Sequence, residues 1–406
     1  MRHRNYRLFF AGQGLSLIGT WMMTVAQSWL VLQLTGEPLL LGLVAAVQWL
    51  PVLVLGLFGG LIADAMPKRR TMLATQSFAA VLSLVMAILV FTGTVAVWHV
   101  LVVAFLLGIR NAVDLPTRQS FSVEMVGRQD VGNAVALNSA QYNLTRIVAP
   151  ALAGVFIAAG SLALGFWVNA AALGVVVWLL WRIRIPSPHL ADRAHAALWL
   201  DLQDGVRYVA ANRVLAIVVL LPAVPALFVL NYLTFIPIYA RDILDTGAIG
   251  LGLLTGSIGV GALIGALTLA SLRPSGGSGR LMLAGLAIVG SALAVFALSR
   301  SLPLSMLALA LQGACQVAYY STTNTLIQVL APARLRGRIL SLYTLTSIGL
   351  IPVANLVGGA IAQVVGVQPV LAAGGLLTVG FAALVAIGRP GVARLRAAHL
   401  SVIAEV

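Results

Sequence analysis

The sequence predicts an all-α polytopic membrane protein, with twelve transmembrane helices arranged as two pseudo-symmetric six-helix bundles. Three observations lead to this fold class. Of the 406 residues, 60% are hydrophobic and 9% are charged, and the mean hydropathy is +1.01, whereas soluble domains carry about 25% charged residues. Apolar runs long enough to cross a bilayer recur along the chain, and cationic side chains cluster between them. This composition excludes a soluble protein of this size, and we expect no enzymatic activity.

Twelve apolar runs reach the length of a membrane-spanning helix. About 20 residues, rising 1.5 Å each, cross the ~30 Å hydrocarbon layer. The first run is too long for the core of a signal peptide, so we expect it to remain as a span. The predicted helices cover residues 8–34, 38–63, 71–92, 98–120, 131–159, 162–182, 214–240, 247–272, 281–299, 302–328, 339–365 and 368–388, with a tight turn around Gly366 before the last.

The cationic residues predict the orientation. With the N-terminus inside, 21 of the 25 Lys and Arg residues fall on the cytoplasmic side, and only Arg241 and Arg300 fall outside. This bias follows the positive-inside rule, so we expect a multi-pass protein of the inner (plasma) membrane with both termini cytoplasmic. The net charge of +14 then suits contact with anionic lipids. We expect no nucleic-acid partner, because a soluble basic domain is missing.

A hydrophilic segment near the middle divides the chain. We expect an N-terminal bundle over 1–182, a cytoplasmic loop over 183–213, a C-terminal bundle over 214–388 and a cytoplasmic tail over 389–406. Apolar residues at helical spacing in the second part of the loop, 198–213, predict an amphipathic helix on the cytoplasmic surface.

The two halves repeat each other at an offset of 205 residues. Gly56 corresponds to Gly261, and Gly154 corresponds to Gly359. Parallel repeats related by an axis along the membrane normal are typical of transporters. The alternative is a chance match between glycine-rich helices.

Three segments carry a resemblance to a known family. Residues 60–70 read Gly-Leu-Ile-Ala-Asp-Ala-Met-Pro-Lys-Arg-Arg, residues 106–110 read Leu-Leu-Gly-Ile-Arg, and residues 150–154 read Pro-Ala-Leu-Ala-Gly. They resemble motifs of the major facilitator superfamily, and the last two resemble motifs of its proton-coupled antiporters. The longer run from Asp114 to Gly154 resembles the subgroup that contains the enterobactin and macrolide exporters. The chain departs from the first motif at Ala65 and Pro67, where the family has Arg and Gly.

The resemblance implies a gating role for the loop after the second helix, which holds the two bundles together on the cytoplasmic side in the family. In this sequence the corresponding residues are Asp64, Lys68, Arg69 and Arg70, with Arg118 at the end of the fourth predicted helix. In the alternative interpretation, Lys68, Arg69 and Arg70 are determinants of topology alone.

Three charged residues stand out in the interior of predicted spans: Arg110, Asp114 and Arg146. An ionised side chain at bilayer depth costs about 2.5–3.5 kcal/mol, so it is usually paired or functional. Our hypothesis is that Asp114 carries the coupling proton and that transport changes the Arg110–Asp114 distance. In the alternative, the two residues form an intrahelical pair, or Asp114 lies near the cytoplasmic face and braces the region of Arg118. The net positive charge of the three residues favours an anionic or acceptor-rich substrate.

Polar residues in three helices are candidates for substrate binding. The resemblance implies that helices 1, 4, 7 and 10 line the central path, and their amides and aromatics suit a bulky amphipathic ligand. Hydrogen bonds between helices are the alternative role. The candidates are Gln13, Thr20 and Gln27, joined on one stripe by Ser16, then Asn231, Phe235, Gln312, Gln316, Tyr319, Tyr320 and Asn324.

The sequence therefore predicts a secondary-active transporter, a proton-coupled exporter of a small amphipathic molecule by alternating access. A lipid or lysolipid flippase, or an importer of the same fold, is the alternative. The chain has no phosphate-binding loop for ATP, its single Cys315 and scattered histidines predict no metal site, and we expect no cofactor. The expected partners are the substrate, protons and membrane lipids, with the protein acting as a monomer.

Overall fold

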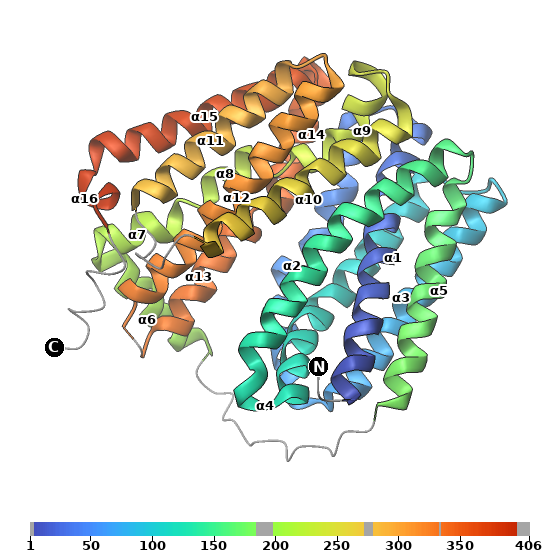
Figure 1. Cartoon of the computed structure of the whole chain (residues 1–406), viewed down its shortest axis with the longest axis horizontal. Helices are drawn as coiled ribbons and strands as arrows, with labels where there is room; N and C mark the ends of the chain where they lie inside the picture. Colours follow the sequence, from blue (N-terminus) through green and yellow to red (C-terminus); the bar gives the residue numbers. More distant parts are fainter. Residues whose placement is uncertain (1–3, 184–197, 272–278, 333, 396–406) are drawn as a thin grey trace. The chain divides into compact units, whose positions relative to one another are not determined.

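The computed structural model consists of helices joined by short turns, with no strand among the residues described, which are 4–183, 198–271, 279–332 and 334–395 (Figure 1). The predicted all-α membrane fold is confirmed. The helices are α1 (Arg4–Thr35), α2 (Pro38–Ala65), α3 (Lys68–Phe91), α4 (Val97–Ala158), α5 (Leu162–Arg182), α6 (Leu198–Ala211), α7 (Arg213–Leu220), α8 (Ala223–Phe228), α9 (Tyr232–Ile238), the π-helix η1 (Tyr239–Ile243), α10 (Gly247–Ser271), α11 (Gly279–Leu298), α12 (Leu302–Leu330), α13 (Arg336–Ile348), α14 (Ile351–Val365), α15 (Val367–Gly388) and α16 (Pro390–Ala393).

Eleven helical stretches of the described chain are long and apolar enough to cross a membrane. Two of them are interrupted, because proline lacks the backbone N–H that a continuous helix needs. The stretch Arg213–Ile243 is divided into α7, α8, α9 and η1 and contains Pro222, Pro225 and Pro237. The stretch Arg336–Val365 is divided into α13 and α14, with a proline in the first turn of α14.

The long helix α4 is a helical hairpin. Its 62 residues would extend about 93 Å as a straight rod, three times the thickness of the hydrocarbon layer. However, Asn138 Nδ2 donates to Ser122 Oγ at 2.9 Å, whereas a straight helix would separate these residues by about 24 Å. The chain therefore reverses between them, and α4 holds the predicted helices 98–120 and 131–159.

The last two spans meet at a glycine turn, as predicted. Gly366 separates α14 from α15 and has a φ of 90°. This left-handed conformation favours glycine, because a Cβ atom would collide with the backbone. The turn lets the two helices pack against each other.

The chain forms two compact units, which differ from the predicted halves in one segment. Unit 1 comprises residues 1–191 and 234–256, and unit 2 comprises residues 192–233 and 257–406. The boundary between them therefore falls within α9 and again within α10. In unit 1, the segment 234–256 packs on α4, since Gly154 of α4 lies against the backbone of Gly252.

Each unit has its own hydrophobic core. In unit 1, α1, α3, α4 and α5 enclose aromatic and aliphatic side chains that include Phe9, Met72 and Phe121. In unit 2, helices α6, α7, α11, α12, α13, α15 and α16 enclose a second cluster that includes Met282 and Leu326. The packed side chains of these cores fix the positions of the helices that carry the polar residues described below.

The repeat is visible as one contact made in both units. Gly108 of α4 lies against the backbone of Gln48 in α2, and Gly313 of α12 lies against the backbone of Ile258 in α10. The two glycines are 205 residues apart. At both positions a Cβ atom would overlap a carbonyl oxygen, so close helix packing requires glycine there.

The amphipathic helix predicted in the central loop is present as α6. It is docked on α13 within unit 2, where Arg338 Nη1 donates to Asp204 Oδ2 at 2.9 Å and Gly205 approaches the Arg338 side chain. The start of the predicted loop, 184–197, and the end of the predicted tail, 396–406, lie outside the described residues.

Candidate functional site

A carboxylate lies at the centre of unit 1. Asp114 on α4 is 0% exposed. Its Oδ1 accepts hydrogen bonds from Thr75 Oγ1 at 2.7 Å and Gln76 Nε2 at 2.8 Å. Its Oδ2 accepts a hydrogen bond from Arg118 and lies 3.3 Å from Arg110 Nη2. Among the carboxylates whose side chains the structure describes, Asp114 alone is buried, and both of its oxygens are occupied.

Helical periodicity explains how the site assembles. Residues 110, 114 and 118 are four apart, so they share one face of α4. Gln76 lies about 12 Å along α3 from the basic start of that helix. The predicted Arg110–Asp114 pair is present, and so is the contact with Arg118 that the alternative interpretation requires. Because the three charges belong to one helix, a rigid movement of unit 1 does not change their spacing.

The guanidinium of Arg110 keeps unused donors. Its Nη1 donates to Asn111 Oδ1 at 2.9 Å. Its Nε and Nη2 are buried without a hydrogen-bond partner among the described residues, although Nη2 lies near Asp114. A buried charged donor without an acceptor is costly. Arg110 can therefore bind an additional acceptor atom, from water or from a transported molecule.

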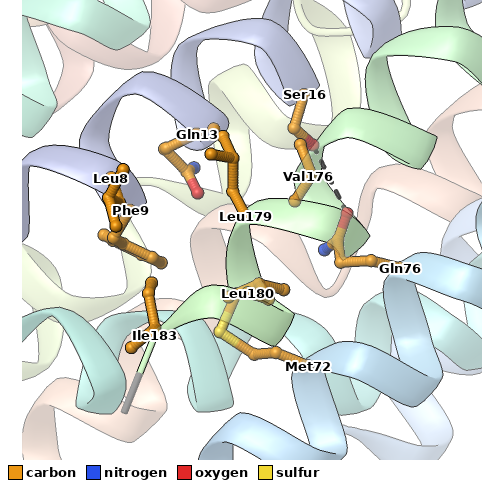
Figure 2. Close-up of a pocket in the computed structure, with 11 residues that line it drawn as sticks. Leu8, Phe9, Gln13, Ser16, Met72, Gln76, Val176, Leu179, Leu180 and Ile183 are labelled. Atoms are coloured by element: carbon orange, nitrogen blue, oxygen red, sulfur yellow. Dashed lines mark hydrogen bonds between the residues drawn. The ribbon is translucent and has the colours of Figure 1, made fainter. Parts of the chain in front are cut away.

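A small cavity adjoins this centre (Figure 2). It has a volume of about 10 Å³, close to the space that one water molecule needs. Gln13 and Ser16 of α1 and Gln76 of α3 are the polar residues among its mainly apolar lining. Ser16 Oγ donates to Gln76 Oε1 at 3.5 Å, so a polar chain runs from Ser16 through Gln76 to Asp114.

Arg146, predicted to join the charge network, lies elsewhere in unit 1. Its guanidinium carbon is 5.8 Å from the centre of the Trp21 ring, a cation–π distance. Tyr142 packs edge-on against the same ring at 6.0 Å. The structure places no contact between Arg146 and Asp114, whose cationic partners are Arg110 and Arg118.

The predicted gating residues do not form one group in the described chain. Lys68, Arg69 and Arg70 are the first turn of α3 rather than a loop. Arg69 donates to the carbonyls of Leu180 and Trp181 at 2.9 and 2.7 Å, which supplies donors to the end of α5. The side chain of Asp64 lies outside the described ones.

The remaining candidates on α1 differ in exposure. Thr20 is exposed and donates to the carbonyl of Ser16 at 2.7 Å, whereas Gln27 is 6% exposed. Phe235, in the segment of α9 that belongs to unit 1, is fully buried. Near it in the chain, Arg241 Nη1 donates to the carbonyl of Leu32 at 2.9 Å, which ties η1 to the end of α1.

Unit 2 contains the other candidates, and none of them is charged. Gln312, Gln316, Tyr319, Tyr320 and Asn324 all lie on α12. Gln312 is 0% exposed and Tyr319 is 1% exposed. Asn231, which precedes α9, is 4% exposed and lies close to Gly358 of α14.

Sequence reasoning missed two partners of Asp114 and assigned a third to another site. Thr75 and Gln76 are neutral residues of α3, and Arg118 was assigned to the gating loop. A signal was available for Gln76, since a lone amide in an apolar span requires a polar partner. Nothing in the sequence identifies which partner it meets.

Comparison with known proteins decides the family. Residues 1–398 match the family described as transmembrane secretion effectors, which is part of the major facilitator superfamily. The chain belongs to this family. The secretion-effector match spans nearly all the described helices, so this chain is a multi-pass membrane transporter and not an enzyme.

Relatives of this secretion effector include proteins named for efflux. The multidrug efflux pump Tap of Mycolicibacterium fortuitum is 26% identical over 88% of this chain and 87% of the pump. The staphyloferrin A transporter of Staphylococcus aureus is 29% identical, over 37% of this chain and 38% of that transporter's length. Macrolide efflux protein A of Streptococcus pyogenes is 22% identical over 52% of this chain and 54% of that protein.

Solved structures share the fold of the secretion effector at low identity. The nucleoside transporter NupG superposes with a TM-score of 0.75 at 12% identity, covering 95% of this chain and 99% of that one. A bacterial homologue of the human lysosomal transporter Spinster gives 0.70 at 14% identity, covering 96% and 98%. These likenesses establish the transporter fold.

Proposed function

We propose that the protein is a proton-coupled exporter of a small amphipathic molecule, and that it works by alternating access in the inner (plasma) membrane. The names of its relatives support export, and the bias of basic residues supports cytoplasmic termini. We further propose that it acts as a monomer, with the substrate, protons and membrane lipids as its partners.

The observation that carries the proton coupling is the burial of Asp114 between two arginines. An ionised carboxylate at membrane depth requires partners, and this one has four. Proton binding removes the negative charge that balances Arg110 and Arg118, and the two cations then repel each other. The acceptor for Thr75 and Gln76 is weakened at the same time.

Proton occupancy therefore acts through the packing of α4 against α3. The carboxylate stabilises the arrangement of unit 1 that the structure describes, and the protonated acid stabilises it less. A proton gradient biases the conformational equilibrium by the difference in proton affinity between the two arrangements. This mechanism does not need the Arg110–Asp114 distance to change through a rigid movement of the unit.

The test is a vesicle assay with the purified full-length chain. A pH-sensitive dye reports proton movement in acidified proteoliposomes while a panel of amphipathic drugs and hydroxycarboxylate siderophores is added. We expect substrate-dependent alkalinisation with the wild-type protein. We expect Asp114→Asn to abolish it while substrate binding, measured separately by equilibrium dialysis, remains.

Asp204→Asn is the matched control, because this exposed carboxylate lies on α6. It should retain proton exchange. Full exchange by Asp114→Asn would remove Asp114 from the coupling mechanism and leave it the bracing role around Arg118. Movement of a fluorescent lipid without proton flux would instead identify a lipid or lysolipid flippase, and substrate accumulation in the opposite direction would identify an importer.

A further inference from the structure

The cavity in unit 1 lies where α1, α3 and α5 meet, and we call it the α1–α3–α5 cavity (Figure 2). Its lining includes Gln13 and Ser16, which are three apart on α1, and Met72 and Gln76, which are four apart on α3. Each pair therefore shares one face of its helix. Apolar residues make up the rest of the lining, so three polar side chains converge on an otherwise apolar space.

The size and lining of the cavity restrict what it can hold. Its volume of about 10 Å³ leaves room for about one water molecule. The lining contains no Asp, Glu, Lys or Arg, so a buried ion would have no counter-charge there. A purely apolar cavity stays dry, whereas a cavity that offers a water molecule roughly two to four polar partners binds it. Water is therefore the occupant that fits.

The polar residues of the lining have unused hydrogen-bonding capacity. Gln76 is 0% exposed, and its Oε1 accepts from Ser16 Oγ at 3.5 Å. That distance is long for a hydroxyl donor, for which about 2.7–2.8 Å is typical, and a bridging water often accompanies so long a contact. Gln13 has no hydrogen-bond partner among the described residues. A water molecule can donate to the Gln76 carbonyl and accept from the Gln13 amide.

Gln76 connects the cavity to Asp114. Its Nε2 donates to Asp114 Oδ1 at 2.8 Å, while its Oε1 takes part in the contact with Ser16. Oδ1 is the oxygen that takes up a proton, because Oδ2 lies against the guanidinium groups of Arg110 and Arg118. A protonated Oδ1 is a donor and needs an acceptor. Half a turn of the Gln76 amide supplies one, since it brings Oε1 to the acid and Nε2 to the cavity.

A water molecule in the cavity accommodates both orientations of the Gln76 amide. It donates to Oε1 when Asp114 is ionised, and it accepts from Nε2 when Asp114 is protonated. An apolar wall would leave the outward atom of the amide unpartnered in both states, which is unfavourable. The hydroxyl of Thr75 has a second acceptor as well, because it lies 3.2 Å from the carbonyl of Met72. Both neutral donors to Oδ1 can therefore turn away from it.

We propose that the α1–α3–α5 cavity binds one water molecule, held by Gln13, Ser16 and Gln76, and that this water lets the Gln76 amide turn when Asp114 takes up a proton. Gln76 is then a positioning residue that acts through Asp114. The role in proton uptake rests on the proposed function, which makes Asp114 the proton carrier. The hydration of the cavity does not depend on that function.

X-ray footprinting of the full-length protein in lipid nanodiscs tests the hydration. X-rays split a bound water molecule in place, and the hydroxyl radical formed oxidises a neighbouring methionine, whose sulfoxide is measured by mass spectrometry. Met72 lines the cavity, whereas Met86 on the same helix does not, and each is 1% exposed. We expect Met72 to be oxidised several-fold faster than Met86 in the wild-type protein.

Two variants should empty the cavity. Val176→Ile adds a methyl group to the lining and removes no polar atom, and Gln13→Leu removes one polar partner of the water. In both, oxidation of Met72 should fall to the rate of Met86. Val175→Ile is the matched control, because this neighbouring valine of α5 is exposed and does not line the cavity. It should keep the wild-type ratio of the two rates.

Proton exchange in the vesicle assay described above tests the role of the water. We expect Val176→Ile to exchange protons several-fold more slowly than the wild-type protein, because the Gln76 amide loses its second partner. Val175→Ile should exchange them at the wild-type rate. Gln13→Leu is not used in this measurement, since Gln13 is also a candidate for substrate binding.

Equal oxidation of Met72 and Met86 in the wild-type protein would overturn the hydration of the cavity, and this comparison requires no variant to fold. Wild-type oxidation of Met72 in both cavity variants would overturn it as well. Wild-type proton exchange by a Val176→Ile protein that has lost Met72 oxidation would overturn the role of the water in proton uptake. Footprinting needs no proton gradient, so a wild-type protein that exchanges no protons would contradict the proposed function and leave the hydrated cavity in place.

Discussion

One buried polar residue in each unit, Asp114 in unit 1 and Gln312 in unit 2, differs sharply in its partners. In unit 1, the polar centre is charged and its carboxylate is fully partnered, with two guanidinium groups, a hydroxyl and an amide around Asp114. In unit 2, the polar residues of α12 are neutral, and Gln312, which is 0% exposed, has no partner for either polar atom in the described chain. The two residues lie on the helices whose glycines, Gly108 and Gly313, make a similar close contact at an offset of 205 residues.

This difference suggests a division of labour. A carboxylate paired with two guanidinium groups stabilises one arrangement of its helices and responds when its charge changes. An unsatisfied neutral site stabilises little by itself and gains most when a ligand supplies the missing partners. We therefore associate unit 1 with energy coupling and unit 2 with recognition.

The largest effect is expected at the charged centre. Asp114→Ala leaves the buried Arg110 and the partly exposed Arg118 without a counter-ion, and we expect the free energy of unfolding to fall by about 3–5 kcal/mol. Thermal unfolding of the purified protein, followed by tryptophan fluorescence, measures the change. Arg338→Gln breaks an exposed ion pair on α13 and should lower stability by less than about 1 kcal/mol. Equal effects would contradict the assignment of Asp114 to a buried, strongly partnered site.

An intermediate effect is expected at the repeated glycine contact. Gly108→Ala and Gly313→Ala each place a methyl group against a carbonyl of the neighbouring helix, and we expect each to reduce stability by about 1–3 kcal/mol. Similar losses of stability in the same unfolding assay would show that the two repeated contacts also contribute similarly to the free energy of unfolding. Gly174→Ala, where the added methyl group meets open space, should be neutral or stabilise by up to about 1 kcal/mol. If only one of the two variants lost stability, the two contacts would be alike in geometry but not in their contribution to stability.

The smallest effect has the opposite sign. Gln312→Leu removes two buried polar atoms that have no partner, so we expect the ligand-free protein to gain about 1 kcal/mol of stability. The unfolding midpoint with and without ligand measures this gain. If the variant were less stable than the wild-type protein, the Gln312 amide would stabilise the fold. Gln312 would then no longer differ from Asp114 in its contribution to stability.

The sequence predicted the architecture because the membrane imposes it. Apolar length and the distribution of cationic residues identified the spans, the tight turn at Gly366 and the amphipathic helix α6. These features depend on local composition. The interrupted helices around α8 and α13 were predicted as continuous, because apolar length does not report where prolines break the hydrogen-bond ladder.

The site was predicted in part, because side-chain partners depend on packing. The pair of Arg110 and Asp114 follows from spacing along one helix, whereas Gln76 reaches Asp114 from another helix. The repeat shows the same limit. Gly56 corresponds to Gly261 by offset, but a side chain at Gly56 would meet open space, whereas one at Gly261 would meet the backbone of Ala310. Identical residues at a fixed offset in the sequence therefore need not lie in equivalent helix contacts.

The passage of two helices from one unit to the other has a mechanical consequence. The boundary falls between Leu233 and Thr234 in α9 and between Gly256 and Ser257 in α10. Pro237 has no N–H to donate to the carbonyl of Leu233. Gly256 is a glycine, a residue type with low helix propensity. Both crossings therefore lie at residues where a helix bends at low cost.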